Sequence, residues 1–255
     1  PQISNNDKEK LEVIYRNANR MNYLINELLT FSKIEMKQMH ISVRKGDIMH
    51  FLEELSHIFD IVAGEREIDF IVSLEDTKEE VWFSPSKLER ILYNLLSNAF
   101  KYTQPGGYVR LSAKLIKEEK ETMVQISVKD SGRGIPKDVQ EQIFESYYQV
   151  EKRDHREGFG LGLSLTRSLI HMHKGEIRVE SEVNKGSDFI VTLNVSEDAY
   201  APDERSSENI TTEEIQKYNQ RIKETIELIP EKLTNKEKDS GRESIMIVED
   251  NKEMN

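Results

Sequence analysis

The sequence predicts an α/β domain that is preceded by one long helix. Apolar residues spaced three and four apart through residues 7–39 predict the long helix. Alternating apolar and polar residues at 108–116, 123–129 and 189–195 predict strands of a sheet. Between these segments, residues 88–107 begin with apolar side chains at the spacing of one buried helical face.

The composition excludes several classes of function. The chain has 255 residues, 36% hydrophobic and 33% charged, and a net charge of -11, which argues against nucleic acid or an anionic membrane as the main partner. There is no cysteine, which excludes disulfides and cysteine-ligated zinc and fits a reducing cytosol. No apolar run approaches the ~20 residues that cross a bilayer, and we see no signal peptide. The abrupt ends lead us to expect a piece of a longer protein.

The long helix has the seam of a coiled coil or helical bundle, formed by Leu11, Ile14, Ala18, Met21, Ile25 and Leu28. Further apolar residues up to Ile34 widen this seam, as a four-helix bundle requires. The helix therefore needs a partner, either its own domain or helices of a second copy. We favour the intermolecular bundle because the heptad pattern is unbroken.

The segment from Ile41 onward predicts the first part of the α/β domain. Residues 41–48 indicate a short strand and turn, and residues 48–62 an amphipathic helix. Short strands are expected at 68–72 and 81–83. Ser84-Pro85-Ser86 then begins the central helix, with serine as a cap and proline in the first turn.

The central helix carries Asn94, Asn98 and Lys101 on a stripe beside its apolar face. Asparagine is a mediocre helix former, so two of them one turn apart indicate a role other than helix stability. An amide oxygen can bind a divalent cation, and a lysine suits a phosphate. A solvated polar face explains this helix equally well.

The predicted hairpin of residues 108–116 and 123–129 ends in Asp130, followed by Gly132, Gly134 and Ile135. Glycines at this spacing let the backbone approach a flat ligand. The carboxylate can accept a hydrogen bond from an exocyclic amine of such a ligand. An ordinary turn is the commoner explanation. We expect Pro136 to begin a helix that runs to about Phe144.

The rest of the chain contains a second glycine segment, closing strands and an acidic tail. Residues 145–157 indicate a lid or an irregular loop, whose basic side chains either neutralise a polyphosphate or are simply solvated. Gly158, Gly160 and Gly162 precede a helix at 164–173, where backbone amides can face an anion. Strands are expected near 177–179 and at 189–195. Residues 197–240 indicate an acidic linker with a helical piece at about 215–229.

In this order and spacing, the motifs resemble those of the sensor histidine kinases of the GHKL ATP-binding superfamily, which includes the gyrase-type ATPases. Residues 94–102 resemble the asparagine box, 130–135 and 158–163 the two glycine boxes, 144–148 the phenylalanine box and 186–189 the last box. Residues 7–39 resemble the second dimerisation helix. The resemblance implies a two-layer α/β sandwich, in which helices cover one face of a mixed sheet and the nucleotide lies between helix and lid.

The resemblance also implies a role for each matched residue. Asp130 would accept a hydrogen bond from the adenine amino group. Asn94 and Asn98 would hold Mg²⁺ against the phosphates of ATP. Lys101 and Tyr102 would contact phosphate and base or ribose, and the second glycine box would cap the phosphate tail. The implied nucleotide site consists of Asn94, Asn98, Lys101, Tyr102, Asp130, Gly132, Gly134, Ile135, Gly158, Gly160, Leu161, Gly162 and Leu163. Asn94, Asn98 and Lys101 would support catalysis.

The implied reaction is transfer of the γ-phosphoryl group to a histidine. In gyrase-type relatives a glutamate one turn before the metal-binding asparagine activates water, and this position is Asn94 here, a poor base. We therefore favour a kinase over two alternatives, a GHKL-type ATPase and a nucleotide-binding signalling module without phosphotransfer.

The match also has departures. None of the six histidines lies in the acceptor pattern of the family, a histidine followed by an acidic residue and a proline. We therefore predict that this polypeptide binds ATP but does not phosphorylate itself. Residues 245–251 look like the first strand of a receiver domain, with Glu249 and Asp250 as its acidic pair, which indicates a hybrid kinase.

These expectations divide the chain into four parts: 1–40, a partial dimerisation domain; 41–196, the catalytic domain; 197–243, the linker; and 244–255, a receiver start. The expected partners are ATP, a second copy joined through the helical bundle, and a response-regulator receiver domain, without nucleic acid. The expected location is the cytoplasmic portion of a membrane-anchored parent protein.

Overall fold

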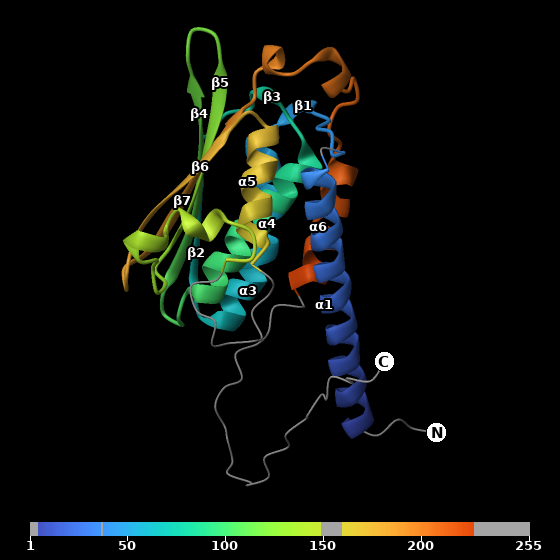
Figure 1. The fold of residues 1–255 in the computed structure, drawn as a ribbon, viewed down its shortest axis with the longest axis vertical. Helices are drawn as coiled ribbons and strands as arrows, with labels where there is room; N and C mark the ends of the chain where they lie inside the picture. The colour runs from blue at the N-terminus through green and yellow to red at the C-terminus, as the bar shows by residue number, and fades with distance from the viewer. Residues whose placement is uncertain (1–4, 37, 149–159, 227–255) are drawn as a thin grey trace, which may run out of the picture.

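The structure is a computed structural model that describes residues 5–36, 38–148 and 160–226 (Figure 1). Its centre is a five-stranded sheet, in which the first pair of strands is parallel and the other pairs are antiparallel. The sheet is therefore mixed, as predicted. In spatial order its strands are β2 (Asp69–Leu74), β4 (Tyr108–Lys117), β5 (Thr122–Asp130), β7 (Gly186–Asn194) and β6 (Glu176–Glu182).

Helices cover one face of this sheet, which confirms the two-layer sandwich (Figure 1). They are α2 (Ile48–Ser56), α3 (Ile58–Arg66), α4 (Pro85–Tyr102) and α5 (Gly162–Met172). The apolar stripe of α4 is buried against the inward side chains of β4 and β5, such as Leu111 and Val128. Burial of this stripe, rather than helix propensity, holds α4 in place.

A second small sheet leads into α4. It pairs β1 (Arg44–Asp47) with β3 (Glu80–Phe83) in antiparallel register. Ser84 follows in an extended conformation, and Pro85 occupies the first turn of α4. Proline is favourable there because the first amide of a helix has no intrahelical partner.

Two predicted helices differ from the structure. The helix expected over 48–62 is divided into α2 and α3 at His57, where the Ser56 hydroxyl donates to the Glu53 carbonyl oxygen and competes with the helical pattern. The helix expected from Pro136 is wrong. Residues 137–144 form two 3₁₀ turns, η1 (Lys137–Val139) and η2 (Gln142–Phe144), tied to β6 by the Gln140 amide, which donates to the Ser181 carbonyl oxygen.

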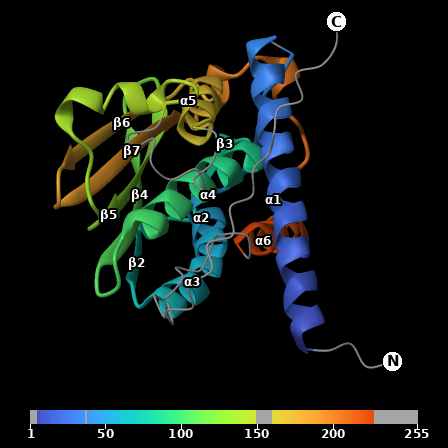
Figure 2. The same cartoon turned by 60° about the horizontal axis from the view of Figure 1, so that its bottom comes forward.

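The long helix α1 (Asn5–Glu35) runs alongside the helical layer (Figure 2). Its predicted seam is exposed, including Leu11, Ile14 and Met21. Its C-terminal part packs on the domain, with Glu27 buried 3.8 Å from the Arg90 guanidinium of α4. Within the described part of the chain, the domain therefore packs against one end of α1, while the apolar seam stays exposed. Among the helices of the described residues, none is both long and apolar enough to cross a bilayer.

The helical piece predicted at 215–229 corresponds to α6 (Thr212–Ile226), and residues 227–229 lie outside the described residues. The sequence predicts a linker around this helix. The structure instead packs α6 on the domain, with Ile215, Tyr218 and Ile222 in the main core. Residues 244–255, in which the receiver start is predicted, lie outside the described residues. The domain boundaries given above stay predictions.

Candidate functional site

The polar stripe of α4 faces the start of α5, and the side chain of Asn94 is fixed there. Its amide nitrogen donates to the Thr166 hydroxyl oxygen at 2.6 Å, while that hydroxyl donates to the Gly162 carbonyl oxygen at 2.9 Å. Because the Thr166 proton is used on Gly162, Thr166 can only accept from Asn94. This pair of bonds orients the Asn94 amide and leaves its oxygen Oδ1 available to a ligand.

Gly162 makes room for this oxygen. A Cβ atom at Gly162 would lie 2.6 Å from Asn94 Oδ1, too close for any larger residue without movement of the amide. The first turn of α5 lacks a capping side chain, so its amides keep the capacity to bind an anion. The structure thus brings Asn94 together with the predicted glycine segment at an uncapped helix N-terminus.

The other residues of the second glycine segment contribute through the backbone. Gly160 has a φ of +70° and accepts the Tyr147 N–H on its carbonyl oxygen at 3.0 Å. The Leu161 side chain is buried, and the half-buried Leu163 side chain packs against the core. Gly158 and residues 149–157 of the predicted lid lie outside the described residues.

The end of α4 carries the remaining predicted residues of the asparagine box. Asn98 is half-buried one turn after Asn94. The Lys101 ammonium lies 4.8 Å, and the Arg133 guanidinium carbon 4.5 Å, from the centre of the Tyr102 ring. Both cations therefore interact with the face of this aromatic ring, and they make this end of the site electropositive.

Asp130 lies buried at the end of β5, where a carboxylate would meet a flat ligand. One carboxylate oxygen accepts the Gly132 N–H at 2.7 Å. Burial raises the pKa of Asp130 to about 6, although the amides of Gly132 and Ser187 favour its charged form. The carboxylate is thus held by backbone amides and keeps acceptor capacity for a further donor.

The loop after Asp130 can approach this site only because of its glycines. A Cβ atom at Gly132 would lie 2.6 Å from the Tyr102 carbonyl oxygen, which brings this loop directly against the end of α4. Gly134 has a φ of +68°, which favours glycine, and Ile135 donates its N–H to the Ser181 hydroxyl at 2.8 Å. Ile135 therefore anchors the loop to β6.

Sequence reasoning missed four residues of this site. Thr166 orients Asn94, Ser187 supplies an amide to Asp130, Arg133 stacks on Tyr102, and Tyr147 donates to Gly160. Arg133, Tyr147 and Ser187 lie in the segments 130–135, 144–148 and 186–189 that the sequence singled out, but no role was assigned to them. Thr166 lies outside those segments, and its only signal is that it follows Gly162 by one helical turn.

The donor set fits Mg²⁺ bound to a nucleotide phosphate. Within the described ranges, no group of three acidic or histidine side chains could hold a metal by itself. Magnesium bound to substrate phosphates needs only one or two protein oxygens, because it keeps several waters. The oriented Asn94 oxygen, with Asn98 one turn further on, supplies such ligands.

Comparison with known proteins agrees with this geometry. Residues 83–197 match the family described as "Histidine kinase-, DNA gyrase B-, and HSP90-like ATPase". The chain is 32% identical to "Histidine kinase P4" of Formosa agariphila over 98% of its own length, and 34% identical to "Sensor histidine kinase WalK" of Bacillus subtilis over 74%. It spans 18% and 31% of the lengths of these two relatives.

Solved structures of histidine kinases share the fold. The crystal structure of full-length ShkA in complex with AMPPNP aligns with 77% of this chain and 40% of that one, with a TM-score of 0.67 and 23% identity. The catalytic domain of histidine kinase ThkA aligns over its whole length and 63% of this chain, with a TM-score of 0.53 and 25% identity.

Fold, site and relatives define a GHKL-type ATP-binding domain of two-component signalling. Residues 83–197 belong to the histidine kinase-, DNA gyrase B- and HSP90-like ATPases, and the chain is homologous to sensor histidine kinases.

Proposed function

We propose that this chain binds Mg²⁺-ATP and donates its γ-phosphoryl group to a histidine on the dimerisation domain of a sensor kinase. The observation that carries the proposal is the oriented Asn94 amide beside the uncapped start of α5, with the buried acceptor Asp130 at the other end of the site. A phosphate tail fits the first end and an adenine amino group the second.

In the proposed reaction the bond from the γ-phosphorus to its bridging oxygen breaks, ADP leaves with the electron pair, and a bond to an imidazole nitrogen forms. Bound Mg²⁺, held by Asn94 and Asn98, would neutralise phosphate charge. The protein positions the triphosphate through the amides at the start of α5 and the cations at the end of α4, which is where most of the catalysis of phosphoryl transfer originates. The amide of Asn94 cannot remove a proton from water, so transfer is favoured over hydrolysis.

The exposed seam of α1 supports a homodimer through a helical bundle. An unpartnered apolar stripe of this length needs other helices to cover it. A receiver domain as phosphoryl acceptor, the hybrid architecture and a cytoplasmic position in a membrane-anchored parent are further parts of the proposal, for which the resemblance is the support.

Calorimetric titration with a non-hydrolysable ATP analogue and Mg²⁺ tests the site. We expect Asn98→Ala to weaken binding about tenfold in Mg²⁺ and much less in EDTA, because it removes a metal ligand. Asn22→Ala, an exposed helical asparagine on α1, is the matched control and should bind as wild type does. Equal affinity of wild type and Asn98→Ala would contradict the metal role. With γ-labelled ATP, acid-labile label on this chain alone would contradict the predicted lack of self-phosphorylation.

A further inference from the structure

The helices α4 and α5 meet at two places. One is the nucleotide site, where Asn94 contacts Thr166 and Gly162. At the other place the start of α4 meets the end of α5, and the Ser84 N–H donates to His173 Nε2 at 3.2 Å. His173 is fully buried, and its Nδ1 lies 2.9 Å from the Leu169 carbonyl oxygen, to which it donates. The second contact therefore joins the start of α4 to the end of α5 through one buried imidazole.

Residues 200–222, here named the C-terminal clasp, hold the end of α5. The buried Tyr200 hydroxyl donates to the Asn194 carbonyl oxygen and lies 3.3 Å from the His173 carbonyl oxygen, which shares the same proton more weakly. Further along, the clasp pairs with the segment before β1. The Val43 N–H donates to the Glu204 carbonyl oxygen at 2.8 Å, and the Ser206 N–H to the Val43 carbonyl oxygen at 2.9 Å. Because β1 pairs with β3, which leads directly into Ser84, the clasp is joined to both helices.

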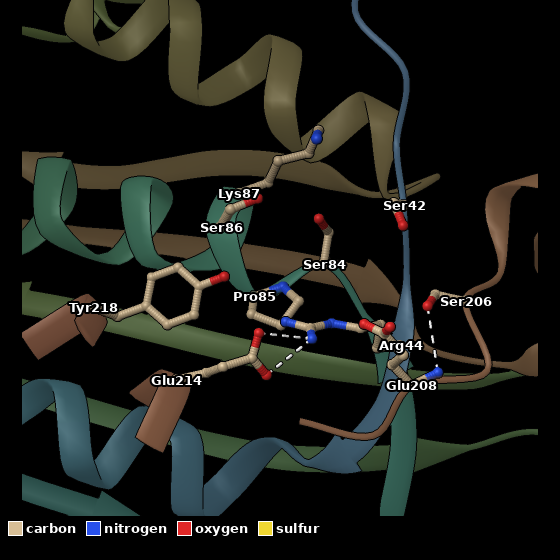
Figure 3. A pocket seen from close by; sticks show the side chains of 10 residues that line it. All are labelled: Ser42, Arg44, Ser84, Pro85, Ser86, Lys87, Ser206, Glu208, Glu214 and Tyr218. Atoms are coloured by element: carbon tan, nitrogen blue, oxygen red, sulfur yellow. Dashed lines mark hydrogen bonds and ion pairs between the residues drawn. The ribbon is translucent and has the colours of Figure 1, made fainter. Parts of the chain in front are cut away.

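The clasp also holds the start of α4. Arg44 of β1 donates to both carboxylate oxygens of Glu214 on α6, at 2.8 and 2.9 Å. Figure 3 shows this ion pair next to Pro85, at a pocket of about 270 Å³ that Ser84 and Tyr218 also line. One turn into α4, Glu89 lies 3.9 Å from Arg221 of α6.

Apolar contacts keep the clasp docked. Tyr218 packs edge-on against Phe51 of α2, with ring centres 5.8 Å apart, and the Arg221 guanidinium carbon lies 4.6 Å from the centre of the Tyr218 ring. Ile215 and Ile222 are buried in the same core as the apolar stripe of α4. The clasp thus belongs to the catalytic unit physically, although the matched ATPase family region ends at residue 197.

We propose that the C-terminal clasp is a positioning element of the nucleotide site, which holds the far ends of α4 and α5 at the separation that the phosphate cradle needs. The inference rests on the proposed nucleotide site. Release of the clasp frees the start of α4 relative to the end of α5, so Asn94 and the amides of α5 no longer converge on one ligand. Arg44 and Glu214 are positioning residues, since they contact each other beside the start of α4 and belong to neither end of the proposed nucleotide site.

Charge reversal tests this role on the whole chain. Arg44→Glu and Glu214→Arg each replace the ion pair by two like charges, and the double variant restores the pair in the opposite direction. We expect each single variant to raise amide hydrogen exchange in α6 and to weaken binding of the ATP analogue about tenfold. The double variant should return both measurements close to wild type. The control is Lys45→Glu, which breaks an exposed ion pair of β1 with Glu80 and should change neither.

A single variant with increased exchange in α6 and wild-type affinity would overturn the inference. If the single variants leave exchange unchanged, Tyr218→Asp removes the buried ring and serves as the second variant, and unchanged affinity after release of α6 again overturns the inference. Wild-type protein that binds no nucleotide refutes the proposed function itself, a different result from a wild-type affinity that is indifferent to the clasp.

Discussion

The two ends of the α4–α5 pair differ in whether their polar groups already have hydrogen-bond or ion-pair partners. At the nucleotide end, polar groups keep hydrogen-bonding capacity: the Asn94 oxygen, the uncapped amides of α5 and the Asp130 carboxylate. At the far end, His173, Arg44 and Glu214 all have partners. Groups that await a ligand contribute little to folding, because their bonds form only on binding. We infer that the far end supplies stability and the nucleotide end supplies affinity.

The two ends also differ in how burial changes a titratable group. Burial raises the pKa of Asp130 to about 6 and lowers the pKa of His173 to about 4. Around neutral pH Asp130 is therefore a desolvated charge, which opposes folding, while His173 is a neutral imidazole, which does not. Separate mutations at the two ends should accordingly change different measurements.

The largest expected effect is at the far end. His173→Leu leaves the buried Ser84 N–H without an acceptor, so we expect the free energy of unfolding to fall by about 3 kcal/mol. Urea unfolding followed by circular dichroism measures it. His171→Leu, an exposed position on the same helix, is the control and should lose much less. Equal losses at both positions would contradict a special role for the buried imidazole.

Mutation of Asp130, at the nucleotide end, should change the free energy of unfolding in the opposite direction. Its pKa is raised from 3.8 to about 6, so its contribution to stability is present below pH 3.8 and is lost as the pH rises through 6. Asp130→Asn removes this charge, and we expect it to raise the free energy of unfolding at pH 8 by about 2 kcal/mol while weakening nucleotide binding. Urea unfolding from pH 4 to 8 checks this, and a variant with the same pH dependence as wild type would refute it.

Most residues of the nucleotide end could be predicted from the sequence, because local patterns mark them. The asparagines of α4, Asp130 and the glycines belong to contiguous segments, where periodicity and turn chemistry report local geometry. The apolar seam of α1 followed from its heptad pattern, whereas the mixed sheet with helices on one face was implied by the resemblance to the histidine kinases. Of the second glycine segment, Gly160 and Gly162 lie at the start of α5, which begins at Gly162, two residues before the predicted start.

The contacts at the far end could not be predicted from the sequence, because they join residues far apart in the chain. Nothing local marks His173 as the acceptor of Ser84, 89 residues earlier, or Glu214 as the partner of Arg44, 170 residues earlier. The acidic composition of residues 197–240 suggested a linker, yet three side chains of α6, those of Ile215, Tyr218 and Ile222, are buried in the main core. Composition averages over a segment, whereas docking depends on one face of it.

A smaller effect is expected for Gly162→Ala. The new Cβ atom would lie 2.6 Å from Asn94 Oδ1 and push the amide away, so we expect nucleotide affinity to fall about tenfold with little loss of stability, since alanine favours the helix. Calorimetry and urea unfolding together test it. Gly64→Ala on α3 is the control, because no atom lies within 4 Å of its added Cβ. A loss of stability without a loss of affinity would break the comparison between the two ends.

The smallest effect concerns how Asn94 is oriented. Thr166→Val keeps the shape of the side chain but removes the hydroxyl that accepts from Asn94 and donates to Gly162. We expect nucleotide affinity to fall about fivefold, equivalent to about 1 kcal/mol, because the amide then rotates and its nitrogen competes for the ligand position.

Thr166→Ser is the matched control for this change, since it keeps the hydroxyl and should bind close to wild type. Titration in Mg²⁺ and in EDTA separates the two ways in which Thr166 could act. If Thr166 orients a metal ligand, the loss in Thr166→Val should appear in Mg²⁺ and shrink in EDTA. A loss of equal size in both conditions would mean that Thr166 only shapes the start of α5, and Asn94 would then lose its assigned role as a metal ligand.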